Sequence, residues 1–256
     1  MHHAPTSCFV VSHFISESFE ESPSTPWEDE QKPWVFEDEV DMSIEDKRVI
    51  ALWDEECRKD GNHYELPIPW RNRDEHLPNN FPVAKKRLDN LMKRLAAANL
   101  VGRYQEEIDK LLDADFAEEV PSDRLRDAVR VFYIPHHNVF NVHKPEKLRV
   151  VFDCACPFQG RSLNQRCMQG PNLLNNLFAV LLGFRVGQFA VQGDVRAMYN
   201  QVRVPESDRD ALRFLWYRGG RLVHLRMKSH LFGGVWCSAA STYALLRTIA
   251  DHPNPI

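Results

Sequence analysis

The chain has 256 residues and a formal net charge of −4, with 43% hydrophobic and 27% charged residues, which are ordinary proportions for a soluble globular protein. No run approaches the roughly 18 apolar residues of a membrane span, and the N-terminus lacks the basic region and cleavage site of a signal peptide. The six cysteines follow no framework spacing, so the sequence predicts reduced thiols in an intracellular protein rather than disulfides or a zinc site.

Residues 1–46 read as an acidic linker. Between residues 16 and 46, twelve Asp and Glu residues stand against one Lys, a net charge of −11, which leaves +7 for residues 47–256. A segment rich in acid, Pro and Ser lacks the periodicity of a packed element, so we expect it to be disordered. The mildly basic remainder is compatible with a polyanion partner, although an ordinary solvated surface explains the charge more simply.

Residues 47–127 predict a mostly helical connecting segment. A short helical pattern over 47–60 is followed by a strand-like HYELPI and a loop rich in Pro and Asn. Apolar stripes at helical spacing predict two amphipathic helices, over about 82–98 and 103–117. We expect the basic clusters of the first helix to be solvated and only secondarily to contact phosphate; they comprise Lys85, Lys86, Arg87, Lys93 and Arg94.

From residue 128 the pattern turns to strands, which gives a mixed α+β class. A Gly219-Gly220 pair between two β-rich runs predicts a hairpin. The expected elements are strands in 128–140 and 147–155, a helix over 171–184 with Pro171 in its first turn, strands at 189–193, 211–217 and 221–228, and a helix over 235–250.

The acid Asp194 ends the apolar run FAVQG, and an aromatic ring follows five residues later at Tyr199. Taken alone, such an acid is most simply a polar cap that faces solvent. Two neighbouring features favour a ligand site instead. Lys147 and Arg149 lie on a preceding strand, where fixed cations can bind a triphosphate. Gly233 and its neighbour precede a helix, where the backbone can approach a ligand closely.

Other polar and aromatic residues favour a structural role. His136, His137 and His143 fit no common metal-ligand spacing on one element, and a turn after a proline explains them better. The rings of Phe214, Trp216 and Tyr217 are predicted to be sheet core rather than platforms for stacked bases.

Four segments carry a resemblance to a known family, in order and densely. From about residue 47 to the end, about four-fifths of the sequence, and most strongly over 131–250, the chain resembles the reverse transcriptase region of BEL/Pao-type LTR retrotransposon polyproteins. The segments are "FYIPHHNVFNVHKPEKLRVVFDCACPFQGRSLN", "MQGPNLLNNL", "GDVRAMYNQVRVPESDRDALRFLWY" and "HLFGGVWCSAASTYALLRT". The resemblance implies a right-hand polymerase fold, with reverse-transcriptase-like fingers and a partial palm in 128–256 behind a helical N-terminal segment.

The resemblance also implies roles for single residues. Asp194 matches the first catalytic aspartate, which would hold Mg²⁺, or Mn²⁺ in its place, with help from the Val195 carbonyl. Tyr199 matches the ring that excludes a ribose 2′-OH, although family members usually carry Phe there. The implied nucleotide-binding set is Lys147, Arg149, Asp153, Val195, Tyr199, Phe232 and Gly233, with Asp153 close to the template nucleotide. The activity would be that of a nucleotidyltransferase, an RNA-directed DNA polymerase, in which two metal ions stabilise the attacking and leaving oxygens.

The sequence departs from the family pattern in two places. No adjacent Asp-Asp pair follows the motif at Phe232, and Cys237-Ser238 stands where relatives often have Ser-Pro. We therefore expect a polyprotein fragment that is inactive alone and needs the remainder of the polyprotein or a partner chain. The implied partners are an RNA/DNA template-primer and a deoxynucleotide, with no membrane, in the cytoplasm. The alternatives are a non-catalytic nucleic-acid-binding or interaction protein domesticated from a retroelement, and a degenerate product without function.

Overall fold

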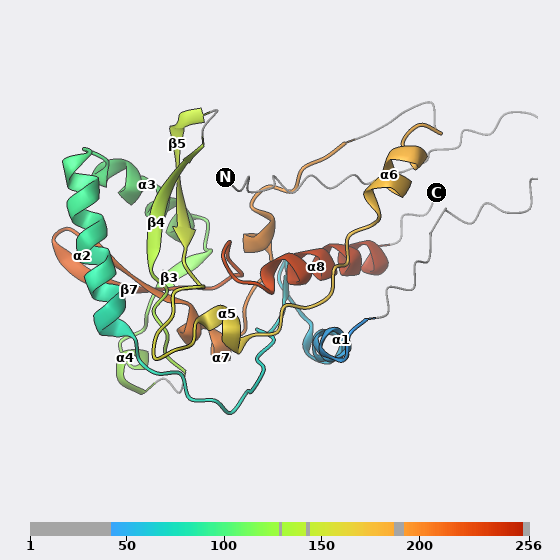
Figure 1. Ribbon diagram of the computed structural model, residues 1–256, viewed down its shortest axis with the longest axis horizontal. Helices are drawn as coiled ribbons and strands as arrows, with labels where there is room; N and C mark the ends of the chain where they lie inside the picture. Colours follow the sequence, from blue (N-terminus) through green and yellow to red (C-terminus); the bar gives the residue numbers. More distant parts are fainter. Residues whose placement is uncertain (1–41, 128–129, 142–143, 187–191, 253–256) are drawn as a thin grey trace, which may run out of the picture.

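The computed structural model describes residues 42–127, 130–141, 144–186 and 192–252 (Figure 1). Helices and small antiparallel sheets alternate along the chain, so the protein is mixed α+β, as predicted. In chain order the elements are α1 (Ile44–Glu56), β1 (Arg58–Asp60), β2 (His63–Glu65), α2 (Phe81–Ala97), α3 (Val101–Asp113), β3 (Ala117–Glu119), α4 (Arg124–Asp127), β4 (His136–Asn141), β5 (Lys144–Phe152), α5 (Leu163–Arg166), α6 (Leu177–Gly183), the 3₁₀ turn η1 (Met198–Gln201), α7 (Glu206–Arg209), the 3₁₀ turn η2 (Asp210–Leu212), β6 (Arg213–Arg218), β7 (Arg221–Met227) and α8 (Cys237–Asp251).

The strands of the described residues form three antiparallel sheets. β3, β7 and β6 form one three-stranded sheet with β7 in the middle, while β1–β2 and β4–β5 are two-stranded. The predicted hairpin between β6 and β7 is confirmed: Gly219 and Gly220 form its turn with φ of 57° and 76°. Positive φ at both central residues is what a tight two-residue hairpin turn requires, and glycine adopts it without steric cost.

One hydrophobic core unites the described chain. The predicted stripe of α2 is buried, and α3 buries Tyr104 and Ile108. Phe214 and Trp216 are fully buried in β6, as expected, whereas Tyr217 is half-buried. Because β3 pairs with β7, the helical segment before residue 127 and the strand-rich segment after it share this core.

Two predicted elements are shorter than their sequence patterns suggested. The helix expected over 171–184 begins only at Leu177, because the Asn176 side chain accepts hydrogen bonds from two backbone N–H groups and caps the helix there. Within the described part of the run 128–140, which begins at residue 130, the strand starts only at His136. Before it, Ile134 donates its N–H to the Arg213 carbonyl, and Pro135 has no N–H to give to a ladder.

Helix ends also differ from the predicted ones. α1 starts at Ile44, within the predicted linker, because the Ser43 hydroxyl accepts a hydrogen bond from the Asp46 N–H. α3 stops at Asp113 rather than 117, since Asp115 adopts a φ of 57° and turns the chain into β3. Most of the strand expected at 189–193 lies outside the described residues.

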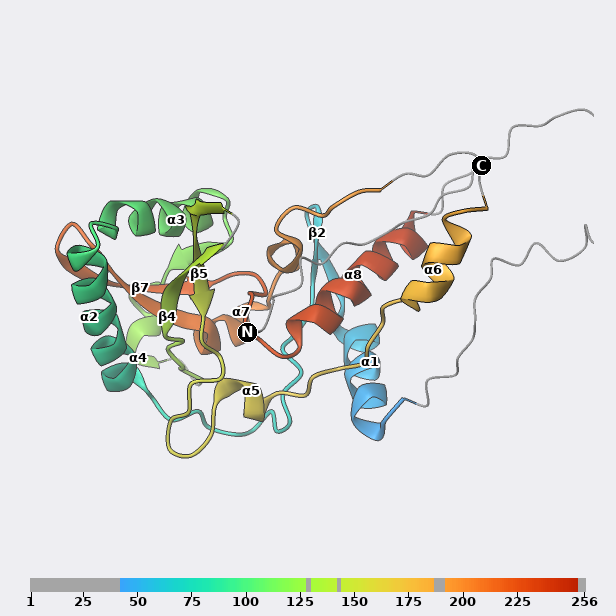
Figure 2. The same ribbon diagram turned by 45° about the horizontal axis from the view of Figure 1, so that its top comes forward.

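The elements gather at two ends of the molecule, and the two views agree on this (Figures 1 and 2). α2, α3 and the β4–β5 hairpin lie at one end with the three-stranded sheet. α1 and α8 lie at the other, where the Trp53 and Tyr243 rings are 5.4 Å apart and the Tyr243 hydroxyl donates to Asp54. Within the described residues, no helix combines the length and apolar character needed to cross a bilayer.

Two buried histidines link folding to pH. His230 is inaccessible to solvent; its Nε2–H donates to the Leu66 carbonyl at 3.1 Å, and its Nδ1 accepts from the Trp236 indole N–H at 2.9 Å. Both contacts suit the neutral ring, and burial lowers the pKa of His230 to about 4. Burial likewise lowers the pKa of His136 to about 4, where the ring contacts the Tyr104 hydroxyl and the Leu215 carbonyl.

We expect the free energy of unfolding to fall as the pH drops from about 6.5 to about 4. In that window the unfolded chain binds protons that the buried histidines of the folded chain do not bind. Stability present above pH 6.5 is therefore lost by up to about 1.4 kcal/mol per pH unit for each ring. Urea unfolding of the wild type and of His230→Gln measures this loss. The variant should show a shallower slope, whereas His252→Gln, at an exposed position, should keep the full slope. An unchanged slope in His230→Gln would contradict the assignment.

Candidate functional site

The loop before α8 lies directly against the end of β5. Gly233 has a φ of 131°, and a Cβ built on it would stand 2.3 Å from the Phe152 carbonyl oxygen. Asn164 holds the loop in place: its Nδ2 donates to the Gly233 carbonyl, and its Oδ1 accepts from the Val235 N–H, both at 3.1 Å. Only glycine satisfies this close approach, so the residue type at 233 determines where the loop lies.

A pair of aromatic rings extends this contact toward η1. The Tyr199 and Phe232 ring centroids are 5.8 Å apart, tilted by 39°, and Phe232 is 48% exposed. Asn200, in the same 3₁₀ turn, donates to the His230 carbonyl at 3.0 Å, which ties the turn to the loop that carries Phe232. The two rings therefore offer an accessible apolar surface. The loop beside them is fixed by hydrogen bonds from Asn164 on one side and Asn200 on the other.

Asp153 directly follows Phe152, the last residue of β5, whose carbonyl the loop before α8 approaches. Its N–H donates to the Pro135 carbonyl at 2.7 Å, and its carboxylate accepts from Arg87 Nη2 at 3.2 Å. Arg87 comes from α2, so the basic face of that helix reaches the site at this residue. Sequence reasoning missed this role, because periodicity indicates only that Arg87 is exposed and not which acid it meets.

Lys147 and Arg149 lie on the outer face of β5. Side chains alternate along a strand, and the intervening Leu148 is buried with Phe152, so the two cations point away from the core. Both are exposed, and Arg149 is paired in register with Val139 of β4. Asp153 lies four residues after Arg149, about 13 Å along the chain at an ordinary strand rise. Within the described residues, neither cation forms a hydrogen bond or ion pair with Asp194.

Asp194 lies in an exposed stretch without regular secondary structure, just before the turn that leads into η1, and Val195 beside it is 38% exposed. A Mg²⁺ ion prefers six hard oxygen ligands. Asp194 offers one carboxylate and Val195 one carbonyl, so these residues suit a hard cation but complete only part of its shell. In the described part of the chain, no group of three or more His, Cys, Asp and Glu side chains gathers at metal-binding distance.

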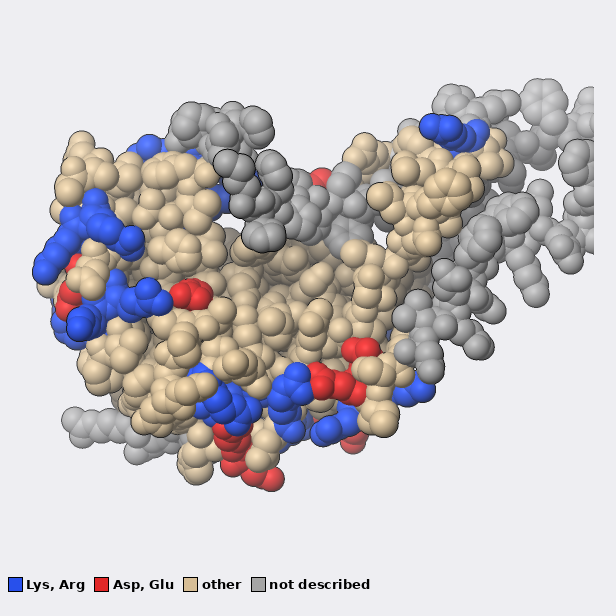
Figure 3. Space-filling model, viewed as in Figure 1, with Lys and Arg blue, Asp and Glu red and all other residues tan. Residues whose placement is uncertain are grey.

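Basic side chains gather over α2 on the face seen in Figure 3, where Lys and Arg cluster at the end of the molecule that α2 occupies. The exposed members from this helix are Lys86, Arg87, Lys93 and Arg94. The middle of the same face is mostly uncharged. A polyanion that approached Asp153 would thus meet positive charge on the α2 side.

The structure therefore brings together four predicted site residues, namely Asp153, Tyr199, Phe232 and Gly233, through the contacts with β5 and η1. It leaves Lys147, Arg149 and Asp194 outside this direct contact. No protein-family model matches the chain, and no curated protein matches it either. The two rings can bind a flat or sugar-like group, and the cation that lies beside Asp153 is Arg87 of α2.

Proposed function

We propose that this chain provides the fingers and part of the palm of an RNA-directed DNA polymerase of a retroelement. One observation supports the proposal above the others: Gly233 abuts the end of β5 while its neighbour Phe232 packs on Tyr199. Three segments that are far apart in the sequence, each with a motif that resembles reverse transcriptases, thereby meet at one place. An exposed ring pair beside a backbone position that only glycine can occupy supports a binding site there.

In this proposal the cations and the rings bind different parts of a deoxynucleotide. Lys147 and Arg149 would bind the triphosphate, which needs fixed positive charge, and Tyr199 would lie against the sugar and reject a 2′-OH. Asp153, held by Arg87, would lie beside the template nucleotide. Template-primer would approach along the basic face of α2. Catalysis of this kind is mostly positioning and electrostatics, so these residues act by placing the substrates.

Asp194 and the Val195 carbonyl would hold Mg²⁺, or Mn²⁺ in its place, which when bound offsets charge on the phosphates. A single exposed carboxylate binds such an ion weakly. We therefore expect the 256-residue chain to bind a metal–nucleotide complex, yet to extend a primer poorly or not at all. Primer extension that is robust, and that Asp194→Ala abolishes, would contradict the expected inactivity.

Nucleotide binding tests the proposal directly. Fluorescence anisotropy of a labelled deoxyadenosine triphosphate, titrated with protein in Mg²⁺ or Mn²⁺, should give saturable binding. We expect Arg149→Gln to weaken it about 10-fold or more, because it removes a charged hydrogen bond worth roughly 1.5–3 kcal/mol. Asp194→Asn should remove the metal-dependent part, and Tyr199→Ala should reduce the preference for deoxyribose over ribose.

The matched control is Lys86→Gln, an exposed cation of α2 that is not assigned to the triphosphate. It should leave nucleotide affinity unchanged while weakening template-primer binding slightly. If none of the site variants changes the affinity for the nucleotide, the polymerase proposal is wrong. If template-primer still bound, the non-catalytic nucleic-acid-binding alternative would replace it.

A further inference from the structure

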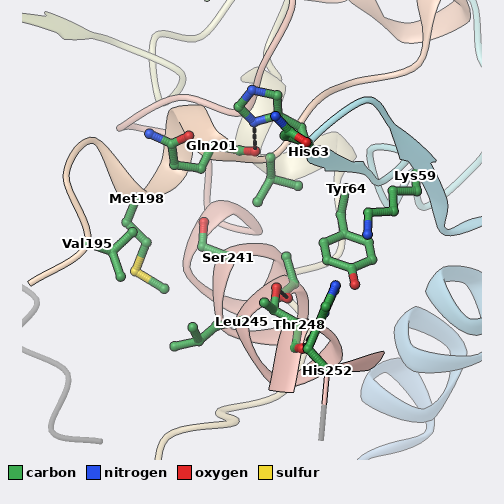
Figure 4. A pocket seen from close by; sticks show the side chains of 13 residues that line it. Lys59, His63, Tyr64, Val195, Met198, Gln201, Ser241, Leu245, Thr248 and His252 are labelled. Carbon is green, nitrogen blue, oxygen red and sulfur yellow. Dashed lines mark hydrogen bonds between the residues drawn. The ribbon is translucent and has the colours of Figure 1, made fainter. Parts of the chain in front are cut away.

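A pocket of about 280 Å³ lies between α8, η1 and the β1–β2 hairpin. In Figure 4, Val195 and Met198 line one side, Lys59 and Tyr64 the opposite side, and Ser241, Leu245 and Thr248 of α8 lie between them. His63 closes it above, where the ring contacts the Gln201 carbonyl at 2.9 Å. Most of the lining is apolar, and the volume is close to the lower end of the range for small-molecule sites.

Ser241 is the unusual member of this lining. It is only 2% exposed, yet its hydroxyl has no hydrogen-bond partner in the described structure. Threonines of the same helix behave differently: Thr242 donates to the Ser238 carbonyl at 3.0 Å, and Thr248 to the Ala244 carbonyl at 2.8 Å. A buried hydroxyl that makes neither this local bond nor any other is destabilising for the free protein.

We propose that this pocket binds a small, mostly apolar molecule that carries one hydrogen-bond-accepting oxygen. The apolar body would lie among Val195, Met198 and Leu245, and Ser241 would donate to the oxygen. A mostly apolar surface with a few polar groups, here including Ser241, His63 and Gln201, is the usual composition of such sites. Met198 has a flexible, polarisable side chain that can rearrange around an occupant and admit it to the helix surface. This inference does not depend on the polymerase proposal.

Two probes of similar shape separate the hydrogen bond from the apolar contact. Acetophenone carries a carbonyl oxygen on an apolar body, and ethylbenzene is the matched molecule without the acceptor. Both are titrated into the ¹⁵N-labelled full chain, and amide shifts of residues 241–248 and 198–202 report binding. We expect saturable binding of both, with acetophenone favoured about three- to ten-fold, the range that one net hydrogen bond gives.

Two variants make the outcome decisive. Ser241→Ala should abolish the preference for acetophenone while ethylbenzene still binds, and it should raise the Tm of the free protein because an unsatisfied hydroxyl is removed. Ala244→Met, a good helix former, should fill the pocket and abolish binding of both probes. The proposal is overturned if neither probe binds saturably to the wild type, or if Ser241→Ala keeps the preference. Amide shifts confined to other parts of the chain would overturn it as well.

Discussion

Replacing Gly233 by alanine should lower the free energy of unfolding by about 2–4 kcal/mol, from backbone strain together with overpacking. The new Cβ would lie 2.3 Å from the Phe152 carbonyl oxygen, and that oxygen belongs to the end of a paired strand rather than to a flexible side chain. The φ of 131° adds strain of its own. To relieve both, the loop must move away from β5 and carry Phe232 away from Tyr199.

The same variant should therefore weaken nucleotide binding at least as much as the loss of a single cation does. Urea unfolding measures the first effect, and anisotropy of the labelled nucleotide measures the second. If the ring pair is the binding surface, both should change together. A variant that loses stability but binds nucleotide with wild-type affinity would show that the rings lie outside the site.

Two glycines serve as matched controls. Gly160 has a φ of 81° but open space where its Cβ would stand, so Gly160→Ala reports strain without overlap. Gly193, directly before Asp194, has neither positive φ nor a close neighbour, so Gly193→Ala should have little effect. We expect Gly233→Ala to exceed Gly160→Ala, and Gly160→Ala to exceed Gly193→Ala. Equal losses for Gly233→Ala and Gly160→Ala would contradict the role of the Phe152 contact.

Much of the fold could be predicted from the sequence wherever the deciding interactions are local. α2 and α8 follow from apolar residues at helical spacing, and the β6–β7 hairpin follows from two adjacent glycines. The predictions were wrong where a polar side chain outweighs the apolar pattern. The helix expected from Pro171 begins at Leu177 because Asn176 caps it, although the apolar run gives no sign of this.

For the candidate site, the sequence indicates which residue types take part, but not which residues contact each other. Spacing can suggest that Gly233 permits a close approach, but the partner, the Phe152 carbonyl, lies far away in the sequence. The pairing of Arg87 with Asp153 is hidden for the same reason, since a helical stripe indicates exposure and not the opposing acid. The relation of Asp194 to Arg149 stays a prediction, because no contact of the described residues joins them.

A buried cluster of charged residues in η2 and the first paired residues of β6 and β7 was also missed. Asp210 is 4% exposed and accepts from Arg213 Nε at 2.9 Å and Nη2 at 2.7 Å, while Arg226 Nη1 lies 3.4 Å away. Both arginines are at most 2% exposed. In the sequence these residues stand among other charged residues beside two strands, a pattern that is typical of a solvent-exposed surface. The sequence therefore does not indicate that they are buried.

Asp210→Ala should therefore have the largest effect on stability, a loss of about 3–5 kcal/mol, because it leaves an uncompensated charge in the core. Arg226 retains Glu118 and Glu206, whose carboxylate oxygens lie at 2.6 and 2.7 Å. Among the residues that the structure describes, Arg213 keeps neutral partners alone, the Arg124 carbonyl at 2.6 Å and the Tyr133 hydroxyl at 3.3 Å. The penalty should thus arise chiefly from Arg213, and urea unfolding at neutral pH measures it.

A second substitution shows whether the lost charge is the cause. Asp210→Ala combined with Arg213→Met removes both ends of the pair, and we expect it to be more stable than Asp210→Ala alone, since an apolar side chain tolerates the buried position.

The control is Asp109→Ala, whose partner Arg218 lies at 3.1 Å on an exposed surface and which should cost less than about 1 kcal/mol. If Asp210→Ala costs no more than Asp109→Ala, water must reach the arginines and they are not buried as described. If instead the double variant is no better than the single one, Asp210 stabilises η2 through its position in the turn, and the charge of Arg213 is secondary.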